Sequence, residues 1–196
     1  MLLLLIVCAM SVSCGRAPKE TAMVADSTQI ILKDTMLLNS EMNVTVESGI
    51  VLEHVRWIYN MVKSESMNLG GSVENDLLDR AYCSKSWNKL LAEVRRKEFR
   101  TYNLFSEVNH WTMAYDTNLV SFDEFEVRNC YIGPNNERTA SVLFTVYTSD
   151  TYMPVRIDLV YEDGQWKIDN FHNLKYMLNL KESMWNFVHS NRSYLI

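Results

Sequence analysis

The chain has 196 residues, of which 47% are hydrophobic and 22% are charged, with only 6 glycines and 3 prolines. This composition indicates one globular domain of ordinary size with an appendage, and it argues against intrinsic disorder over most of the chain. The net charge of -5 argues against a nucleic-acid partner, because phosphate binding needs clustered lysine and arginine.

An apolar run over residues 2–10 opens the chain, and small residues follow it directly before Cys14. The run is shorter than the roughly 20 residues that cross a bilayer, but it has the length of the apolar part of a signal peptide. The Ser13-Cys14-Gly15 junction resembles the lipobox of bacterial lipoproteins. This resemblance implies that residues 1–13 are a signal peptide and that Cys14 becomes the lipidated first residue. A plain secretory signal peptide cut near the same place is the alternative.

We therefore expect a membrane-anchored lipoprotein of the cell envelope that faces the periplasm. Residues 14–45 show no sustained hydrophobic period, which predicts a lipid attachment site followed by a tether. Once Cys8 is removed and Cys14 is acylated, Cys83 and Cys130 remain in an oxidising compartment. They could form one disulfide or stay two buried thiols, because a sequence does not give the distance between them. No cluster of histidine and cysteine accompanies them, so we expect no zinc site.

Helical spacing of apolar residues predicts three helices at the start of the folded domain. The first is expected over residues 46–66, with one face formed by Val51, Val55, Ile58 and Val62. The second is short and contains Leu77, Leu78, Ala81 and Tyr82. Ser84 or Ser86 can cap the third. Its apolar face is expected to hold Trp87, Leu90, Leu91, Val94 and Phe99.

Alternation of apolar and polar residues predicts an antiparallel sheet of four strands. The first strand contains Phe125, Val127 and Tyr131; the second Ala140, Val142, Phe144 and Val146; the third Val155, Ile157, Leu159 and Tyr161; the fourth Trp166 and Ile168. Two turns connect them, one at residues 133–136 (GPNN) and one at Asp163-Gly164, a pair that tolerates positive φ. The upstream helices are expected to cover the apolar face of this sheet, which makes the fold class α+β.

The last segment, residues 173–196, is expected to be a C-terminal helix. Its helical stripe consists of Leu174, Met177, Leu178, Met184, Trp185 and Val188 and is interrupted by Lys181. The α+β domain itself is expected over residues 46–172.

The order long helix, short helix, helix, loop and four-stranded meander resembles the nuclear-transport-factor-two-like superfamily of cone-shaped α+β domains. More closely, the chain looks like a family of uncharacterised lipoproteins from Gram-negative cell envelopes. Three stretches carry the resemblance: residues 77–84 (LLDRAYCS), Tyr115-Asp116 with Phe122-Asp123, and residues 164–169 (GQWKID). It implies a curved sheet that encloses a ligand pocket together with the helices. The superfamily contains enzymes and binding modules, so the fold does not choose between them.

The loop before the first strand holds the candidate ligand contacts His110, Trp111, Tyr115 and Asp116. They could line the mouth of the pocket, and His110 and Asp116 could pair for acid–base chemistry. A purely structural loop is the alternative, since no nucleophile accompanies them. Three more polar residues could face the pocket or solvent, namely Arg156, Asp158 and Asp169. A carboxylate in an apolar pocket would have a raised pKa and could act as a base.

No nucleophile elbow, dinucleotide fingerprint or metal-ligand cluster is present in the sequence. The sequence therefore predicts no catalytic residue, no cofactor and no metal. We expect a lipid-anchored binding module for a small molecule, a peptide or another envelope protein. The first alternative is a dehydratase- or isomerase-like enzyme that uses a pocket carboxylate or histidine. The second is a structural interaction protein whose cavity is filled, because the 11 methionines could fill it together with aromatic side chains.

Overall fold

The computed structural model describes residues 43–64, 75–105, 109–113, 120–149 and 151–190. Within these ranges the fold is α+β, with four helices and one five-stranded antiparallel sheet, as the sequence predicts for the class. The expected signal peptide, Cys14, Tyr115 and Asp116 lie outside the described residues. Of the expected tether, only the last three positions are described, and they are helical.

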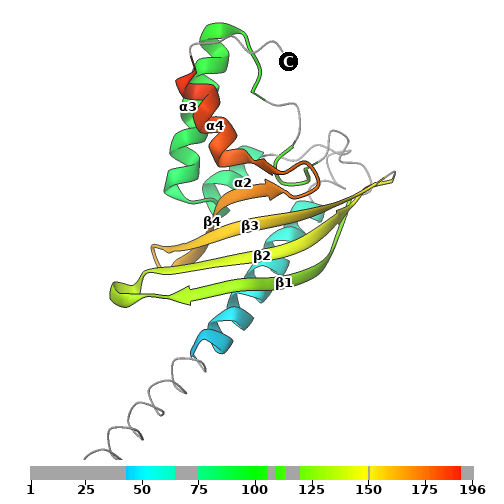
Figure 1. Cartoon of the computed structure of the whole chain (residues 1–196), viewed down its shortest axis with the longest axis vertical. Helices are drawn as coiled ribbons and strands as arrows, with labels where there is room; N and C mark the ends of the chain where they lie inside the picture. Colours follow the sequence, from blue (N-terminus) through cyan, green and yellow to red (C-terminus); the bar gives the residue numbers. More distant parts are fainter. Residues whose placement is uncertain (1–42, 65–74, 106–108, 114–119, 150, 191–196) are drawn as a thin grey trace, which may run out of the picture. The chain divides into compact units, whose positions relative to one another are not determined.

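A long helix over residues 43–64 runs across one face of the sheet (Figure 1). Its predicted apolar face is confirmed, because the following residues are fully buried: Val51, Val55, Ile58 and Val62. Two polar contacts fix this helix on the sheet. The Trp166 indole Nε1 donates to Glu47 Oε1 at 3.0 Å, and His54 Nε2 donates to the Trp166 carbonyl at 3.0 Å.

Two further helices follow, α2 over Asn75–Tyr82 and α3 over Lys85–Thr101. Ser84 is the N-cap of α3, one of the two predicted candidates, and its Oγ accepts the Trp87 N–H at 2.9 Å. The same hydroxyl donates to Asp169 Oδ1 on the sheet at 2.6 Å, so the cap also docks the helix. The placement of Phe99 in the core is wrong, because this residue is exposed near the far end of α3.

The sheet contains β1 (Ser121–Ile132), β2 (Arg138–Tyr147), β3 (Tyr152–Glu162), β4 (Gln165–Asn173) and β5 (Leu178–Asn179), paired in that order. The predicted count of four strands is therefore wrong by one. The fifth strand has two residues, too short for an alternation pattern to reveal. The turn prediction at Asp163-Gly164 is confirmed: both residues have positive φ, 51° and 80°.

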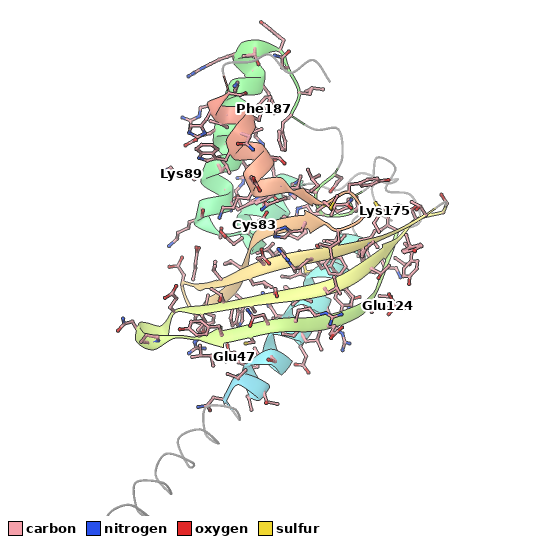
Figure 2. All side chains as sticks on the ribbon, in the orientation of Figure 1. Glu47, Cys83, Lys89, Glu124, Lys175 and Phe187 are labelled. Carbon is pink, nitrogen blue, oxygen red and sulfur yellow. The ribbon has the colours of Figure 1, made fainter. Side chains whose placement is uncertain are left out.

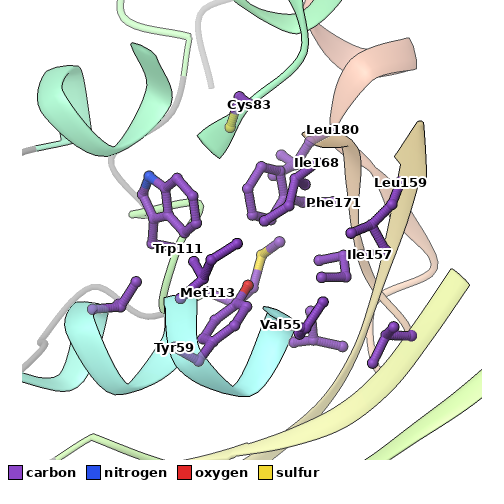
Figure 3. Close-up of a cluster of buried hydrophobic side chains, with 14 of the residues drawn as sticks. Val55, Tyr59, Cys83, Trp111, Met113, Ile157, Leu159, Ile168, Phe171 and Leu180 are labelled. Atoms are coloured by element: carbon purple, nitrogen blue, oxygen red, sulfur yellow. The ribbon is translucent and has the colours of Figure 1, made fainter. Parts of the chain in front are cut away.

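Buried side chains from the sheet and the helices fill the space between them (Figure 3). The largest include Tyr59 from the long helix, Trp87 from α3, Trp111 from the segment before β1, and Phe144 and Phe171 from the sheet. Their rings pack at mutual angles, with centroids 4.4 Å apart for Tyr59 and Phe144 and 4.8 Å for Trp87 and Phe171. This aromatic core occupies the face that the helices cover.

A register shift between β3 and β4 changes which residues of β4 face the core. Ile168 pairs with Leu159 and Asn170 with Asp158, so Asp169 is the extra residue of a bulge. Beyond the bulge Phe171 lies in the core, while Asn170 turns to the outer face of the sheet.

The C-terminal helix α4 spans Leu180–His189 and is shorter than the predicted segment 173–196. Residues 174–177 form a turn instead, and Leu174 and Met177 are exposed there. Asn179, the last residue of β5, caps α4, because its Oδ1 accepts the Glu182 N–H at 3.1 Å. In Figure 1, α3 and α4 lie side by side next to the β4 edge of the sheet.

Cys83 and Cys130 are free thiols in this structure, and only Cys83 is buried, whereas the second predicted alternative had both buried. Cys83 lies beside Ile168 on β4, whereas Cys130 pairs with Ala140 across β1 and β2. Three strand spacings of about 4.8 Å separate β1 from β4, whereas a disulfide needs Cα atoms within about 7 Å. The two cysteines are therefore too far apart to form a disulfide with each other.

None of the helices in the described part of the chain is long and apolar enough to cross a membrane.

Candidate functional site

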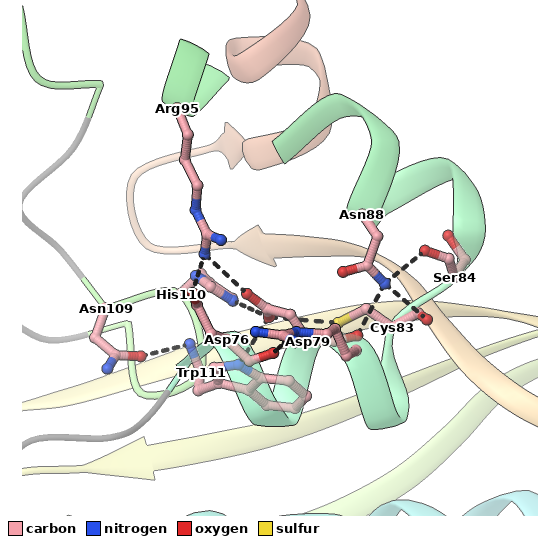
Figure 4. Close-up of polar contacts among 10 residues, drawn as sticks. Asp76, Asp79, Cys83, Ser84, Asn88, Arg95, Asn109, His110 and Trp111 are labelled. Carbon is pink, nitrogen blue, oxygen red and sulfur yellow. Dashed lines mark hydrogen bonds and ion pairs between the residues drawn. The ribbon is translucent and has the colours of Figure 1, made fainter. Parts of the chain in front are cut away.

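A buried carboxylate, Asp79, organises the polar centre of the domain (Figure 4). Its Oδ1 accepts three donors: His110 Nε2 at 2.7 Å, the Trp111 indole Nε1 at 3.1 Å and Cys83 Sγ at 3.7 Å. Asp79 itself is only 1% exposed. A buried carboxylate is tolerated when donors surround it in this way, because unpaired burial would cost several kcal/mol.

Local sequence explains how these groups come together. Asp79 lies on α2, and Cys83 directly follows the last residue of this helix, four positions after Asp79. His110 and Trp111 lie in a tight turn, in which Asn109 Oδ1 accepts the Trp111 N–H at 2.9 Å. Asn88 of α3 secures the other side, since its Nδ2 donates to the Asp79 carbonyl at 2.9 Å.

The second carboxylate oxygen of Asp79 has no hydrogen bond among the described residues. An Arg95 guanidinium nitrogen lies 3.8 Å from it and is also paired with Asp76. Burial raises the pKa of the Cys83 thiol well above its usual value, and the charge and hydrogen bond of Asp79 raise it further. Cys83 is therefore a thiol that donates to Asp79, and it does not supply a thiolate nucleophile.

Chemically, Asp79 and His110 form a carboxylate–imidazole pair. The carboxylate orients the ring by accepting from Nε2, which leaves Nδ1 without a hydrogen bond in the described part of the chain. The His110 side chain is 14% exposed and packs against the rings of Trp87 and Phe171. Such a pair can take up a proton at Nδ1 if a substrate reaches it.

The structure pairs His110 with Asp79, whereas Asp116, the partner considered from the sequence, lies outside the described residues. Trp111 is fully buried, so a ligand contact would require its ring to leave this position. Sequence reasoning missed Asp79 as a site residue. The sequence pattern that could have indicated it is the position of Asp79, which directly follows Leu78 and stands four positions before Cys83. Both neighbours are buried, so an acidic residue between them is placed on the buried side of the short helix.

A second pair of the same kind lies on the outer face of the sheet. His172 Nε2 is 2.6 Å from Asp158 Oδ2, and the Arg156 Nε lies 3.2 Å from Asp158 Oδ1. Burial alone would raise the pKa of Asp158, but the hydrogen bond and charge of His172, aided by Arg156, hold it below its usual value. Asp169 is also paired, with Ser84 and with Lys181 Nζ at 2.6 Å. These three predicted polar residues are therefore held by partners within the protein.

A groove of about 610 Å³ lies between α3 and α4, away from the predicted site. Its floor is formed by Asn170 and Asn179, and its walls by Ser86, Lys89, Leu90 and Glu93 of α3 and by Lys181, Glu182, Trp185 and His189 of α4. The Trp185 ring stacks on His189, with centroids 4.3 Å apart and an angle of 21° between the planes. Lys89 on α3 is exposed (Figure 2).

No group of three or more histidine, cysteine or acidic side chains that could hold a metal ion occurs among the residues that the structure describes. Comparisons with protein-family models, with curated proteins and with solved structures found no match for this chain.

Proposed function

We propose that the chain is a lipid-anchored binding module of the cell envelope and that its ligand site is the groove between α3 and α4. The observation that carries this proposal is the exposed Trp185 beside a groove of about 610 Å³. That volume falls within the range of about 300 to 1,000 Å³ that is common for small-molecule sites. Exposed tryptophans also contribute much of the binding energy where they meet a partner.

The filled interior supports a site on the surface. Tyr59, Trp87 and Trp111 occupy the space between the helices and the sheet, and each is at most 1% exposed. A ligand in the interior would have to displace these rings. A ligand in the α3–α4 groove displaces only solvent.

The envelope location rests on the apolar run at residues 2–10 and on the Ser13-Cys14-Gly15 junction. Assignment to the nuclear-transport-factor-two-like superfamily is part of the same proposal. It is supported by the long helix that crosses one face of an antiparallel meander and by the short α2 that follows it in the chain.

Replacement of Cys14 by serine tests the anchor. Stable anchoring needs two lipid signals, and a diacylated cysteine supplies both chains. Cys14→Ser should therefore move the protein from the membrane fraction to the soluble envelope fraction. Equal partitioning of variant and wild type would remove the anchor from the proposal.

A thermal-shift screen of periplasmic metabolites, glycans and peptides tests the binding function. A compound that binds only the native state raises the melting temperature by mass action. The shift should disappear in Trp185→Ala and persist in Trp57→Ala, a matched control because Trp57 is 51% exposed and lies outside the groove. A shift that survives Trp185→Ala would place the site elsewhere.

The second candidate is a dehydratase- or isomerase-like enzyme, and the Asp79–His110 pair is the observation that favours it. His110 would act as the base at Nδ1, and Asp79 would hold the ring. A screened compound that is also converted should lose turnover in His110→Gln while its binding is retained, because the imidazole acts in the transition state. Unchanged turnover in that variant would remove this candidate.

A further inference from the structure

The polar groups that line the α3–α4 groove are balanced in charge. Lys89 and Lys181 contribute two positive charges, and Glu93 and Glu182 contribute two negative charges. Lys181 is already neutralised by Asp169 at 2.6 Å, and Glu93 lies 3.9 Å from Arg96. A strongly anionic ligand would meet the two glutamates, and a strongly cationic ligand would meet the lysines.

Several of these groups have unused hydrogen-bonding capacity. In the described part of the chain, the Lys89 ammonium, the Glu182 carboxylate and the Asn179 amide nitrogen make no hydrogen bond or ion pair. Lys89 and Asn179 are donors, whereas Glu182 is an acceptor. A ligand that matches this lining must offer donors and acceptors side by side, which a hydroxyl group does in a single atom.

The aromatic wall adds an apolar surface. Trp185 is 55% exposed even though one side of its ring stacks on His189. His189 Nδ1 donates to the Trp185 carbonyl at 2.8 Å, which holds the imidazole against the indole. A flat indole fixed in this way can receive the C–H face of a sugar ring, since that face is apolar while the ring's edge carries hydroxyls.

We propose that the α3–α4 groove binds an uncharged oligosaccharide, with one sugar ring stacked on Trp185 and its hydroxyls bonded to Lys89, Asn179 and Glu182. This inference rests on the proposed binding function and specifies its ligand class.

Tryptophan fluorescence provides a direct test. The chain has 5 tryptophans, and Trp87, Trp111 and Trp166 are at most 3% exposed. In a Trp57→Phe protein, Trp185 is therefore the one exposed indole, so a change in emission on titration reports on the groove. The probes are the neutral hexasaccharides of glucose and of N-acetylglucosamine, in α- and β-linked forms where both exist.

At least one neutral hexasaccharide should quench or shift the emission with a saturable curve. The response should vanish in Trp185→Ala, and Lys89→Met and Glu182→Gln should each weaken the affinity about tenfold, a typical loss for one hydrogen bond to a charged group. All three residues are exposed, so the circular dichroism and melting temperature of each variant should stay close to those of the parent protein.

The negative outcomes separate the two proposals. If no hexasaccharide binds but a peptide or metabolite from the thermal-shift screen does, with dependence on Trp185, the saccharide inference is overturned and the binding function stands. If an oligogalacturonate binds more tightly than the neutral sugars, the uncharged class is overturned. If neither sugars nor screened compounds perturb Trp185, both proposals fail.

Discussion

The aromatic core and the α3–α4 groove contain the same kinds of side chain in opposite settings. In the core, Trp166 and the carboxylate of Asp79 are closed to solvent, and each has hydrogen-bond partners within the protein. In the groove, Trp185 is exposed, and the Glu182 carboxylate makes no bond in the described part of the chain. Aromatic and acidic groups of the core therefore serve folding, while those of the groove remain available to a ligand. Substitutions in the two regions should separate stability from binding.

The largest loss of stability is expected from Trp166→Ala. This change removes a buried indole and its bond to Glu47, and should lower the free energy of unfolding by about 3 to 5 kcal/mol. Urea denaturation measures the difference, with Trp57→Ala as the exposed control. If both variants lost the same amount, Trp166 would not be a core residue.

Asp79→Ala should lower the free energy of unfolding by about 3 kcal/mol, because it leaves the Trp111 N–H and the His110 ring without their shared acceptor. The matched control is Asp76→Ala, three residues earlier on α2. Asp76 is largely exposed, so its ion pair with Arg95 contributes less than about 1 kcal/mol. An Asp79 variant as stable as the Asp76 variant would mean that the buried network does not support the fold.

Lys97 is expected to hold the C-terminal end of α4. Its Nζ donates to the carbonyls of Phe187 at 2.5 Å, Val188 at 3.3 Å and Ser190 at 2.6 Å. Lys97→Met should therefore cost about 1 kcal/mol and speed amide hydrogen exchange in α4, because the terminal carbonyls lose a cation. Lys89→Met on the same helix is the control and should leave exchange unchanged. Equal exchange in the two variants would contradict the capping role.

The smallest effect is expected from Asp158→Asn on the outer face of the sheet, and it should depend on pH. The folded protein holds the pKa of Asp158 below its usual value, so the ionised carboxylate stabilises the fold at pH values above the unfolded pKa of about 3.9. This stabilisation should be lost as the pH falls from there through the lower folded pKa. Melting temperatures between pH 2 and 7 should show the wild-type advantage at pH 7 shrinking toward acid. A constant difference would show that the carboxylate charge is not involved.

Periodicity predicted the elements that form by local rules. The buried face of the first helix, the Ser84 cap and the Asp163-Gly164 turn all follow from residues close in sequence. The bulge at Asp169 could not be predicted, because it depends on how β4 aligns with β3. Alternation also gives no sign of the two-residue β5.

The sites were harder to predict than the fold because they join distant segments. Asp79 meets His110 across 31 positions, and Lys89 of α3 shares the groove with Trp185 of α4. Trp111 lies in a loop between polar residues, so no periodic pattern in its local sequence predicts that its side chain is buried. The helical stripe of the last segment includes Trp185 as an apolar position, yet packing leaves its indole exposed.

Ligand-dependent stabilisation in two matched tryptophan variants tests the central claim most directly. Trp57 and Trp185 are both about half exposed, and only Trp185 lines the groove. With a ligand identified in the screen, the melting temperature of Trp57→Ala should rise as much as that of the wild type, and that of Trp185→Ala should not rise. An equal rise in both variants would contradict the assignment of the α3–α4 groove as the binding site.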